Sequence, residues 1–143
     1  MKIIRVINGP NLNMLGIREP EIYGRETYAD LERCIRESAA ALGAQAEVFQ
    51  SNHEGDLVDY IQQALGAADA IVINPAAYTH TSVAVLDALK AVGLPAVEVH
   101  LSDVQSREEF RRVSYAALGC VAVVAGLGFE GYRRAMEILM NII

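Results

Sequence analysis

The tripeptide EVH at residues 98–100 places a carboxylate and an imidazole two positions apart in the chain. Residues i and i+2 of an extended strand project to the same side, so Glu98 can bind the ring of His100 and fix its tautomer. A histidine held in this way can act as a general acid. A strand-end histidine that is simply hydrogen-bonded to a surface glutamate is the alternative, and the triplet alone favours that alternative.

The segment NGPNLNMLGIREPEIYG, residues 8–24, has no hydrophobic period although it follows the apolar run IIRVI. Long loops in compact domains are usually functional, and the glycines and prolines at both ends suit a lid loop over about residues 8–24. Tyr23 could act as a base only if a cation favoured its phenolate, and Arg18 stands five residues before it. An ordered surface loop with an exposed arginine and a packed tyrosine remains open.

Other reactive side chains argue against a metal or a cofactor. No metal-ligand spacing and no cysteine partner connects the three histidines, which are His53, His80 and His100. The only lysines are Lys2, at the start of the first predicted strand, and Lys90, in a predicted helix, so neither is well placed to form a Schiff base beyond the carboxyl ends of the strands. The GLGFEG motif comes too late in the chain for a dinucleotide-binding fingerprint, so tight turns explain its glycines better.

The elements that must position these residues alternate along the chain. Continuous apolar runs predict buried strands at residues 3–7, 46–50, 70–74, 96–100 and 120–125. Helical patterns lie between and after them, at residues 27–43, 55–68, 82–93 and 129–142, with a short irregular helical segment near 106–112. We therefore predict an α/β, flavodoxin-like three-layer sandwich whose five-stranded parallel sheet has the strand order 2-1-3-4-5.

The residues at the carboxyl ends of the predicted strands are unusually polar. The first three strands are followed by NGPNLN, QSNHEG and NPAAYTHTS, and the fourth ends in EVH before LSD. In an open parallel sheet the ligand crevice lies beyond the carboxyl ends, where such groups converge. A site at this edge is therefore favoured over plain loops.

The predicted helix at residues 82–93 is apolar nearly all round, and only Asp87 and Lys90 break the pattern. One face can cover the sheet while another meets a second subunit. A helix buried deep in its own domain fits the same pattern equally well.

Length and composition limit the class of protein. A chain of 143 residues with 52% hydrophobic content suits a single domain, residues 1–143. The net charge is −6 and no block of basic residues could follow a phosphate backbone, so nucleic acid is a poor partner. The apolar runs are shorter than a bilayer span, and the N-terminus enters a strand at once, without room for a signal peptide. We therefore expect a cytoplasmic protein with no membrane partner.

Five long segments resemble the successive signatures of the type II 3-dehydroquinate dehydratases. In order, over nearly the whole chain, they are NGPNLNMLGIREPEIYG, FQSNHEGDLVDYI, NPAAYTHTSVAVLDAL, EVHLSDVQSREEFRRVSY and GLGFEGY. The resemblance implies a homododecamer, a tetramer of trimers, that dehydrates 3-dehydroquinate to 3-dehydroshikimate in the shikimate pathway or in quinate breakdown. It also implies that neither a metal nor a cofactor takes part.

By the same resemblance, single residues acquire roles in an anti elimination. Tyr23, as a phenolate favoured by Arg18, takes the proton next to the ketone, and an enolate forms. A water held partly by Asn11 stabilises the enolate oxygen. His100, oriented by Glu98, then protonates the departing hydroxyl.

The resemblance assigns substrate binding to further residues. It implies that Asn74, His80 and Arg111 bind the ring hydroxyls. Ser102 and the backbone around Leu101 would hold the substrate carboxylate. Asp87 would reach the site of the neighbouring subunit.

Two positions depart from the family pattern. Asp103 replaces the usual Asn after the Ser of EVHxS, and it either places negative charge near an anionic substrate or points to solvent. Val113 stands where the family often has His before SY, which can alter the packing behind Arg111. The residues by themselves leave two other functions open: a non-catalytic flavodoxin-like binding module, and a different lyase or isomerase acting on a cyclic keto acid.

Overall fold

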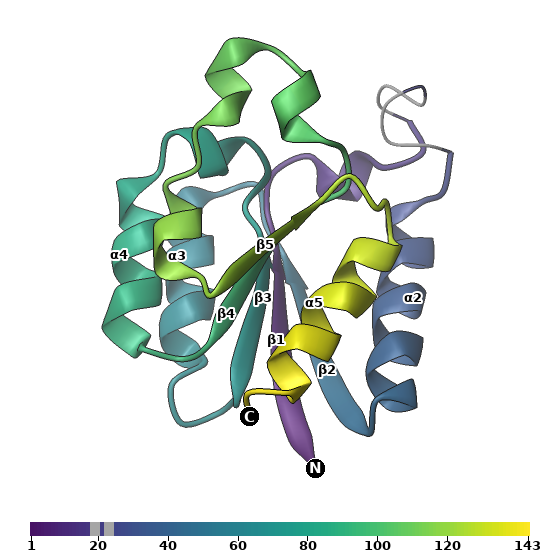
Figure 1. The fold of residues 1–143 in the computed structure, drawn as a ribbon, viewed down its shortest axis with the longest axis vertical. Helices are drawn as coiled ribbons and strands as arrows, with labels where there is room; N and C mark the ends of the chain where they lie inside the picture. Colours follow the sequence, from purple (N-terminus) through teal and green to yellow (C-terminus); the bar gives the residue numbers. More distant parts are fainter. Residues whose placement is uncertain (18–20, 22–24) are drawn as a thin grey trace.

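The sheet has the predicted topology. The computed structural model describes residues 1–17, 21 and 25–143. Within these residues, one five-stranded parallel sheet has the order β2-β1-β3-β4-β5, as predicted (Figure 1). Its strands are β1 (Lys2–Asn8), β2 (Ala44–Gln50), β3 (Ala70–Asn74), β4 (Ala96–His100) and β5 (Ala122–Ala125).

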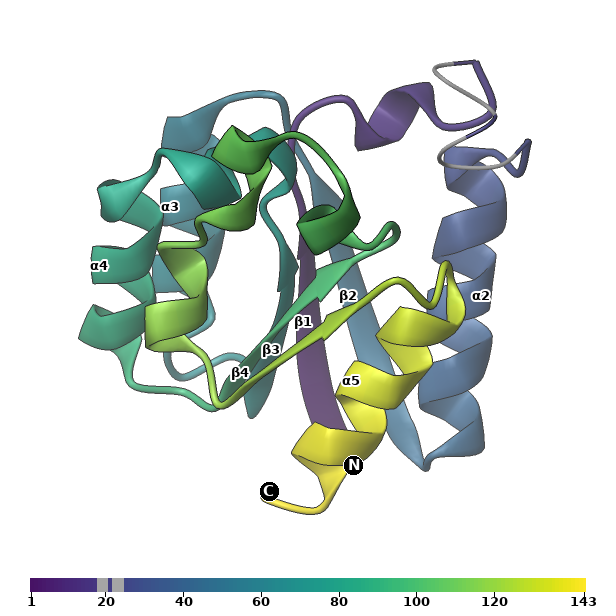
Figure 2. The same ribbon diagram turned by 45° about the horizontal axis from the view of Figure 1, so that its top comes forward.

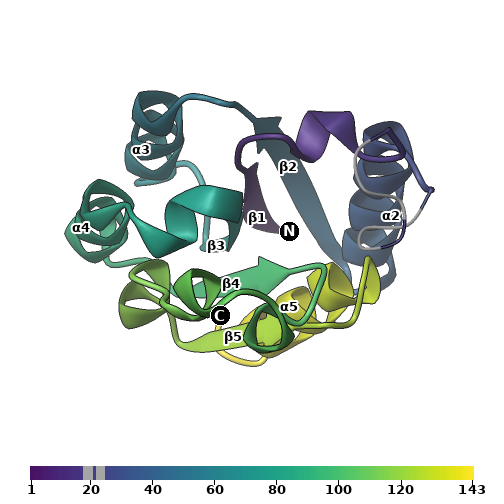
Figure 3. The ribbon, with the colours of Figure 1, turned by 90° about the horizontal axis from the view of Figure 1, so that it is seen from above.

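Helices cover both faces of the sheet. Two of them, α2 (Tyr28–Ala41) and α5 (Glu130–Met140), pack on one face, while α3 (Glu54–Gln63) and α4 (Val83–Val92) pack on the other. Figure 3, a view from above, shows the sheet between these two pairs of helices. The architecture is therefore the predicted flavodoxin-like three-layer sandwich.

Local signals set several of the observed boundaries. Thr27 caps α2 in a capping box, because its side chain accepts from the Asp30 backbone N–H while the Asp30 carboxylate accepts from the Thr27 backbone N–H. Gly43 follows this helix with a φ of 75°, the left-handed conformation expected at its end. The last strand begins at Ala122 rather than at the predicted Cys120, because η5 (Ala116–Gly119) ends just before that cysteine.

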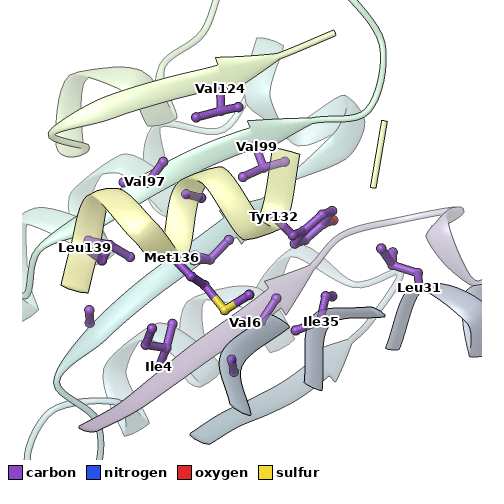
Figure 4. Packing of buried hydrophobic residues seen from close by; sticks show 14 of the residues in the cluster. Ile4, Val6, Leu31, Ile35, Val97, Val99, Val124, Tyr132, Met136 and Leu139 are labelled. Atoms are coloured by element: carbon purple, nitrogen blue, oxygen red, sulfur yellow. The ribbon is translucent and has the colours of Figure 1, made fainter. Parts of the chain in front are cut away.

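The core consists of two layers of buried side chains, one on each face of the sheet. In Figure 4, residues of β1, β4 and β5 pack against the α5 side chains Tyr132, Met136 and Leu139. Tyr132 is the largest of the fully buried side chains. As a tyrosine in an apolar layer, it needs a hydrogen-bond partner for its hydroxyl.

The carboxyl ends of the strands form one edge of the sheet, away from the two chain termini (Figure 1). Above it lie the short helices η1 (Leu12–Met14), η2 (Ala76–His80), η3 (Val104–Ser106) and η4 (Glu109–Arg112). The strand pairing sets Asn8 of β1 directly beside Asn74 of β3 at this edge. Across the described residues, no helix is both long enough and apolar enough to cross a membrane.

Candidate active site

A cleft at the carboxyl ends of the strands is lined by the turn after β1, the turn after β3 and the segment that follows β4. Figure 2 shows the turn after β1 and the segment after β4 at the same end of the sheet. The cleft holds about 520 Å³ of empty space, which includes its open mouth. Seven residues predicted from the sequence line it together: Asn11, Asn74, His80, His100, Leu101, Ser102 and Arg111. Polar residues that follow different strands in the sequence therefore lie together at this edge.

Glu98 and His100 form a buried hydrogen-bonded pair, the arrangement that the EVH triplet alone did not favour. His100 Nε2 lies 2.7 Å from Glu98 Oε2, and the two residues are only 5% and 1% exposed. The carboxylate accepts, so His100 donates from Nε2, and a ligand in the cleft would meet Nδ1. The burial of Glu98 rules out the alternative of a surface glutamate.

Two hydroxyl groups that the sequence reasoning did not single out hold the Glu98 carboxylate in place. Ser114 Oγ donates to Glu98 Oε1 at 2.6 Å, and Thr79 Oγ1 donates to the same oxygen over a longer 3.4 Å. Ser114 Oγ also accepts from the Ala117 backbone N–H, so its single proton is left for Glu98. Both hydroxyls lie inside the quoted motifs, which was the only signal that could have pointed to them.

The Asn74 amide is held at both of its ends. Its Nδ2 donates to the hydroxyl of Tyr132 at 3.0 Å, and its Oδ1 accepts from the backbone N–H of Ala76 at 3.1 Å. Ala76 has a φ of 54°, a left-handed conformation uncommon for a residue with a Cβ. Such strain is found at sites where the surrounding structure fixes the backbone.

Gly9 brings the ends of β1 and β3 into close contact. Its backbone N–H donates to the Asn74 carbonyl at 2.8 Å, and a Cβ at this position would lie 2.5 Å from the carbonyl oxygen of Pro75. Any side chain here would displace the turn that carries Asn74 and Ala76. The position therefore requires glycine because two backbones meet there.

His80 binds the backbone carbonyl of Val113, one of the two residues that differ from the family pattern. Its Nδ1 lies 2.7 Å from the Val113 carbonyl oxygen, so Nδ1 carries the proton and Nε2 is the acceptor nitrogen. The Val113 side chain is 50% exposed. Since His80 uses the backbone, the valine at this position leaves its orientation intact.

Two guanidinium groups give the cleft positive charge. Arg111 and Arg107 both line it, and both lie near the exposed carboxylate of Glu108, at 2.8 and 3.9 Å from their Nε atoms. Arginine binds carboxylates and hydroxyl oxygens well because its donors form a rigid fork. The cleft therefore suits an anionic ligand.

The turn after β1 is tied to the loop after β2 through amides. The backbone N–H of Asn11, which has a φ of 70°, donates to Asn52 Oδ1 at 3.0 Å. Gln50 Nε2 contacts the Gly9 carbonyl at 3.2 Å and Asn13 Oδ1 at 3.4 Å. Gln50 and Asn52 were assigned no role from the sequence. Asn52 holds the Asn11 backbone, and Gln50 supports this turn through the Gly9 carbonyl and through Asn52 Oδ1, at 3.2 Å.

Asp103, the other residue that differs from the family pattern, does not line the cleft. It is exposed, and its Oδ1 accepts from the Gln105 backbone N–H at 3.1 Å, which caps η3. Of the two expectations for Asp103, the geometry favours the one in which its side chain points to solvent.

Two predicted residues, Arg18 and Tyr23, lie outside the described residues. Among the described ones, Asp87 does not line the cleft. Asp87 is exposed on the outer face of α4, where Val83 is also 50% exposed. Among the residues that the structure describes, no group of three or more His, Cys, Asp or Glu side chains could hold a metal ion.

The sequence and the fold both match known proteins along the chain. The family model of dehydroquinase class II matches residues 1–140. The 3-dehydroquinate dehydratase of Clostridium acetobutylicum is 49% identical over 143 residues, covering 100% of this chain and 99% of the relative. The catabolic 3-dehydroquinase of Verticillium alfalfae is 58% identical over 134 residues, covering 94% and 89% of the two chains.

A solved structure agrees equally well. The type II dehydroquinase from Butyrivibrio crossotus superposes with a TM-score of 0.94 at 48% identity, covering 96% of this chain and 97% of the other. The likeness of fold therefore extends over nearly the whole chain.

Proposed function

The chain belongs to the class II dehydroquinases, and from that premise we propose how its cleft dehydrates 3-dehydroquinate to 3-dehydroshikimate. The observation that carries the proposal is the buried Glu98–His100 pair, which opens into a cleft lined by Arg107 and Arg111. Such a site combines a positioned proton donor with cations for an anionic substrate.

His100 is the general acid of the proposed reaction. With Nε2 bonded to Glu98, a protonated ring would present Nδ1–H to the hydroxyl that leaves. Glu98 stabilises the imidazolium, and Ser114 keeps the carboxylate turned toward the ring. Proton transfer to the departing oxygen completes the loss of water.

The base is Tyr23, and Arg18 favours its phenolate. Neither residue belongs to the described part of the chain, so these two roles rest on the resemblance of NGPNLNMLGIREPEIYG to the family's motif. Removal of the proton next to the ketone gives an enolate. A water held partly by Asn11 stabilises its oxygen, and the bond from the Asn11 backbone to Asn52 supports that position.

The substrate is bound by residues from three segments of the cleft. Asn74, His80 and Arg111 take the ring hydroxyls, and His80 contributes the acceptor nitrogen Nε2. Ser102 and the backbone around Leu101 hold the carboxylate. The elimination uses neither a metal nor a cofactor.

The proposed assembly is a homododecamer, a tetramer of trimers, in the cytoplasm. Asp87 would reach the site of a neighbouring subunit, which its exposed position on α4 allows. The exposed Val83 on the same helix would be covered in the assembly.

The experiment is a turnover assay on the purified protein after treatment with chelator and borohydride. We expect 3-dehydroquinate to give the ultraviolet absorbance of a conjugated enone. We also expect His100→Ala to abolish the signal, while His53→Ala, which changes an exposed histidine outside the cleft, retains it. A folded, assembled protein that binds the compound without turnover would be a binding module instead.

A further inference from the structure

We propose that Tyr132, which lies in helix α5 outside the cleft, is a positioning residue that fixes which way the Asn74 amide faces the substrate. Its ring belongs to the apolar core layer, together with Met136 and Leu139 of the same helix (Figure 4). Its hydroxyl nevertheless bonds to two asparagines at the carboxyl ends of β1 and β3. This inference rests on the proposed role of Asn74 in substrate binding.

The direction of each hydrogen bond follows from counting protons. Tyr132 donates its single proton to Asn8 Oδ1 at 2.7 Å. It must therefore accept from Asn74, whose Nδ2 lies 3.0 Å away. The Ala76 backbone N–H sets this order, because it can only donate, to Asn74 Oδ1, and so leaves Asn74 Nδ2 facing Tyr132. Asn8 continues the same order, since its Nδ2 donates to the hydroxyl of Tyr28 at 3.3 Å.

The proton stays on Tyr132 under all working conditions. Burial raises the pKa of the Tyr132 hydroxyl above its ordinary value, and burial also raises the pKa of Tyr28 to about 12. Tyr132 and Asn8 are both fully buried, so water does not compete for these bonds. The Tyr132 proton therefore stays available for the bond to Asn8 Oδ1.

Only one orientation of Asn74 satisfies both of its neighbours. Its Oδ1 faces the Ala76 backbone N–H, and its Nδ2 faces Tyr132. A flipped amide would set its NH2 group against the Ala76 N–H and remove the donor from Tyr132. Without the Tyr132 hydroxyl, the Asn74 amide keeps only its bond to the Ala76 N–H. Its buried Nδ2 is then left without an acceptor, which favours a rotation of the amide toward another one.

An apolar core position would be filled equally well by phenylalanine. The hydroxyl of Tyr132 is what connects this position to the cleft, since Asn74 lines the cleft and Tyr132 does not. Tyr132 and Asn74 are 58 residues apart in sequence, so their contact depends on the packing of α5 against β3.

The test is the variant Tyr132→Phe, which removes the hydroxyl and keeps the ring. We expect kcat/KM to fall by about tenfold, mainly through a higher KM, because an interaction used in binding is weakened. The matched control is Tyr28→Phe, which breaks the same chain one step further away and contacts Asn8 but not Asn74. It should lower the thermal unfolding midpoint while leaving kcat/KM within about twofold.

A double-mutant cycle with Asn74→Ala separates positioning from general destabilisation. If Tyr132 acts through Asn74, adding Tyr132→Phe to Asn74→Ala should cause no further loss of kcat/KM. Asn8→Ala is a second variant in case Tyr132→Phe does not fold. Asn8→Ala removes the acceptor of the Tyr132 proton, which can then turn toward Asn74 and oppose the Asn74 Nδ2 donor. We therefore expect kcat/KM to fall in Asn8→Ala as well.

Three results would overturn the inference. Additive losses in the double variant would mean that Tyr132 does not act through Asn74. A wild-type kcat/KM in Tyr132→Phe, alongside a clear loss in Asn74→Ala, would refute the positioning role and leave the proposed role of Asn74 standing. Unchanged kinetics in Asn74→Ala would remove the binding role of Asn74 itself, and the inference with it.

Discussion

The Glu98 carboxylate receives hydrogen bonds from His100, Ser114 and Thr79 while it is almost fully buried. A buried carboxylate with several donors is held in one orientation, and it holds the imidazole in turn. The EVH triplet alone could not separate this arrangement from a surface pair, because burial is not a property of three residues.

Replacing Glu98 by glutamine should show how much this carboxylate contributes. The glutamine NH2 group would face either the Nε2–H of His100 or the hydroxyl of Ser114, and the imidazolium would lose its counter-charge. We expect kcat in Glu98→Gln to fall by about two orders of magnitude in steady-state assays, with a much smaller change in KM. Glu109→Gln, at an exposed glutamate outside the cleft, is the control and should behave as wild type.

The proposed base can be tested in the same way. Tyr23→Phe removes the phenolic oxygen and should lower kcat by on the order of 10³, whereas a competitive inhibitor should still bind in calorimetry. Tyr60→Phe, at a tyrosine of α3 that does not line the cleft, serves as the control. Robust turnover by Tyr23→Phe would remove that residue from the role of base.

Asp103 is a departure from the family that should have little effect. Its carboxylate caps η3 and lies outside the cleft lining, and asparagine can make the same bond to the Gln105 N–H. We expect Asp103→Asn to leave kcat/KM within about twofold of wild type. A large gain in substrate affinity would instead show that the charge reaches the substrate.

At the level of elements, the site depends on how the ends of two strands meet. The pairing of Asn8 with Asn74 and the contact of Gly9 with Pro75 bring the turns after β1 and β3 together. The parallel order of the sheet places these turns at one edge. The close contact of their backbones then fixes the position of the Asn74 backbone in the cleft.

Gly9→Ala is the variant that tests this contact. The new Cβ would lie 2.5 Å from the Pro75 carbonyl oxygen, so one of the two turns must move. We expect a loss of about 1–3 kcal/mol in the free energy of unfolding, measured by urea denaturation, together with reduced kcat/KM. Gly55→Ala in α3, where a Cβ meets nothing within 4 Å, should leave stability unchanged or slightly increased.

At the level of the whole molecule, α4 presents a mixed outer face. The side chains Val85, Ala88 and Leu89 belong to the core layer on this face of the sheet, and Leu86 is also buried, while Val83 and Asp87 are exposed. This answers the question left open by the near-continuous apolar pattern of the helix, since part of it faces away from its own domain. A subunit contact at that face is the basis of the proposed assembly.

Asp87→Ala should weaken that assembly or the substrate binding that depends on it. We expect light scattering to show species smaller than twelve 15.5 kDa chains, or kinetics to show a raised KM. Asp59→Ala, at an exposed aspartate of the neighbouring helix α3, is the control. If mass and kinetics both stay at their wild-type values, Asp87 does not bridge subunits.

The sequence by itself determined the order and type of the elements and the edge of the sheet at which the site lies. Apolar runs and helical periods depend on neighbouring residues, and the alternation of strands and helices permits few topologies. The Thr27 cap and the contact of Glu98 with His100, though not the burial of that pair, could be predicted for the same reason, since their partners stand two or three residues away.

Only the tertiary structure decided what holds the site residues in place. Ser114 reaches Glu98 across 16 residues, and Tyr132 reaches Asn8 across 124. Such bonds leave no periodic signal, because they depend on which side chains the packed helices and strands bring within about 3 Å of one another. Which buried polar group finds which partner is therefore settled by packing, and packing makes Asn74 and His100 parts of one site.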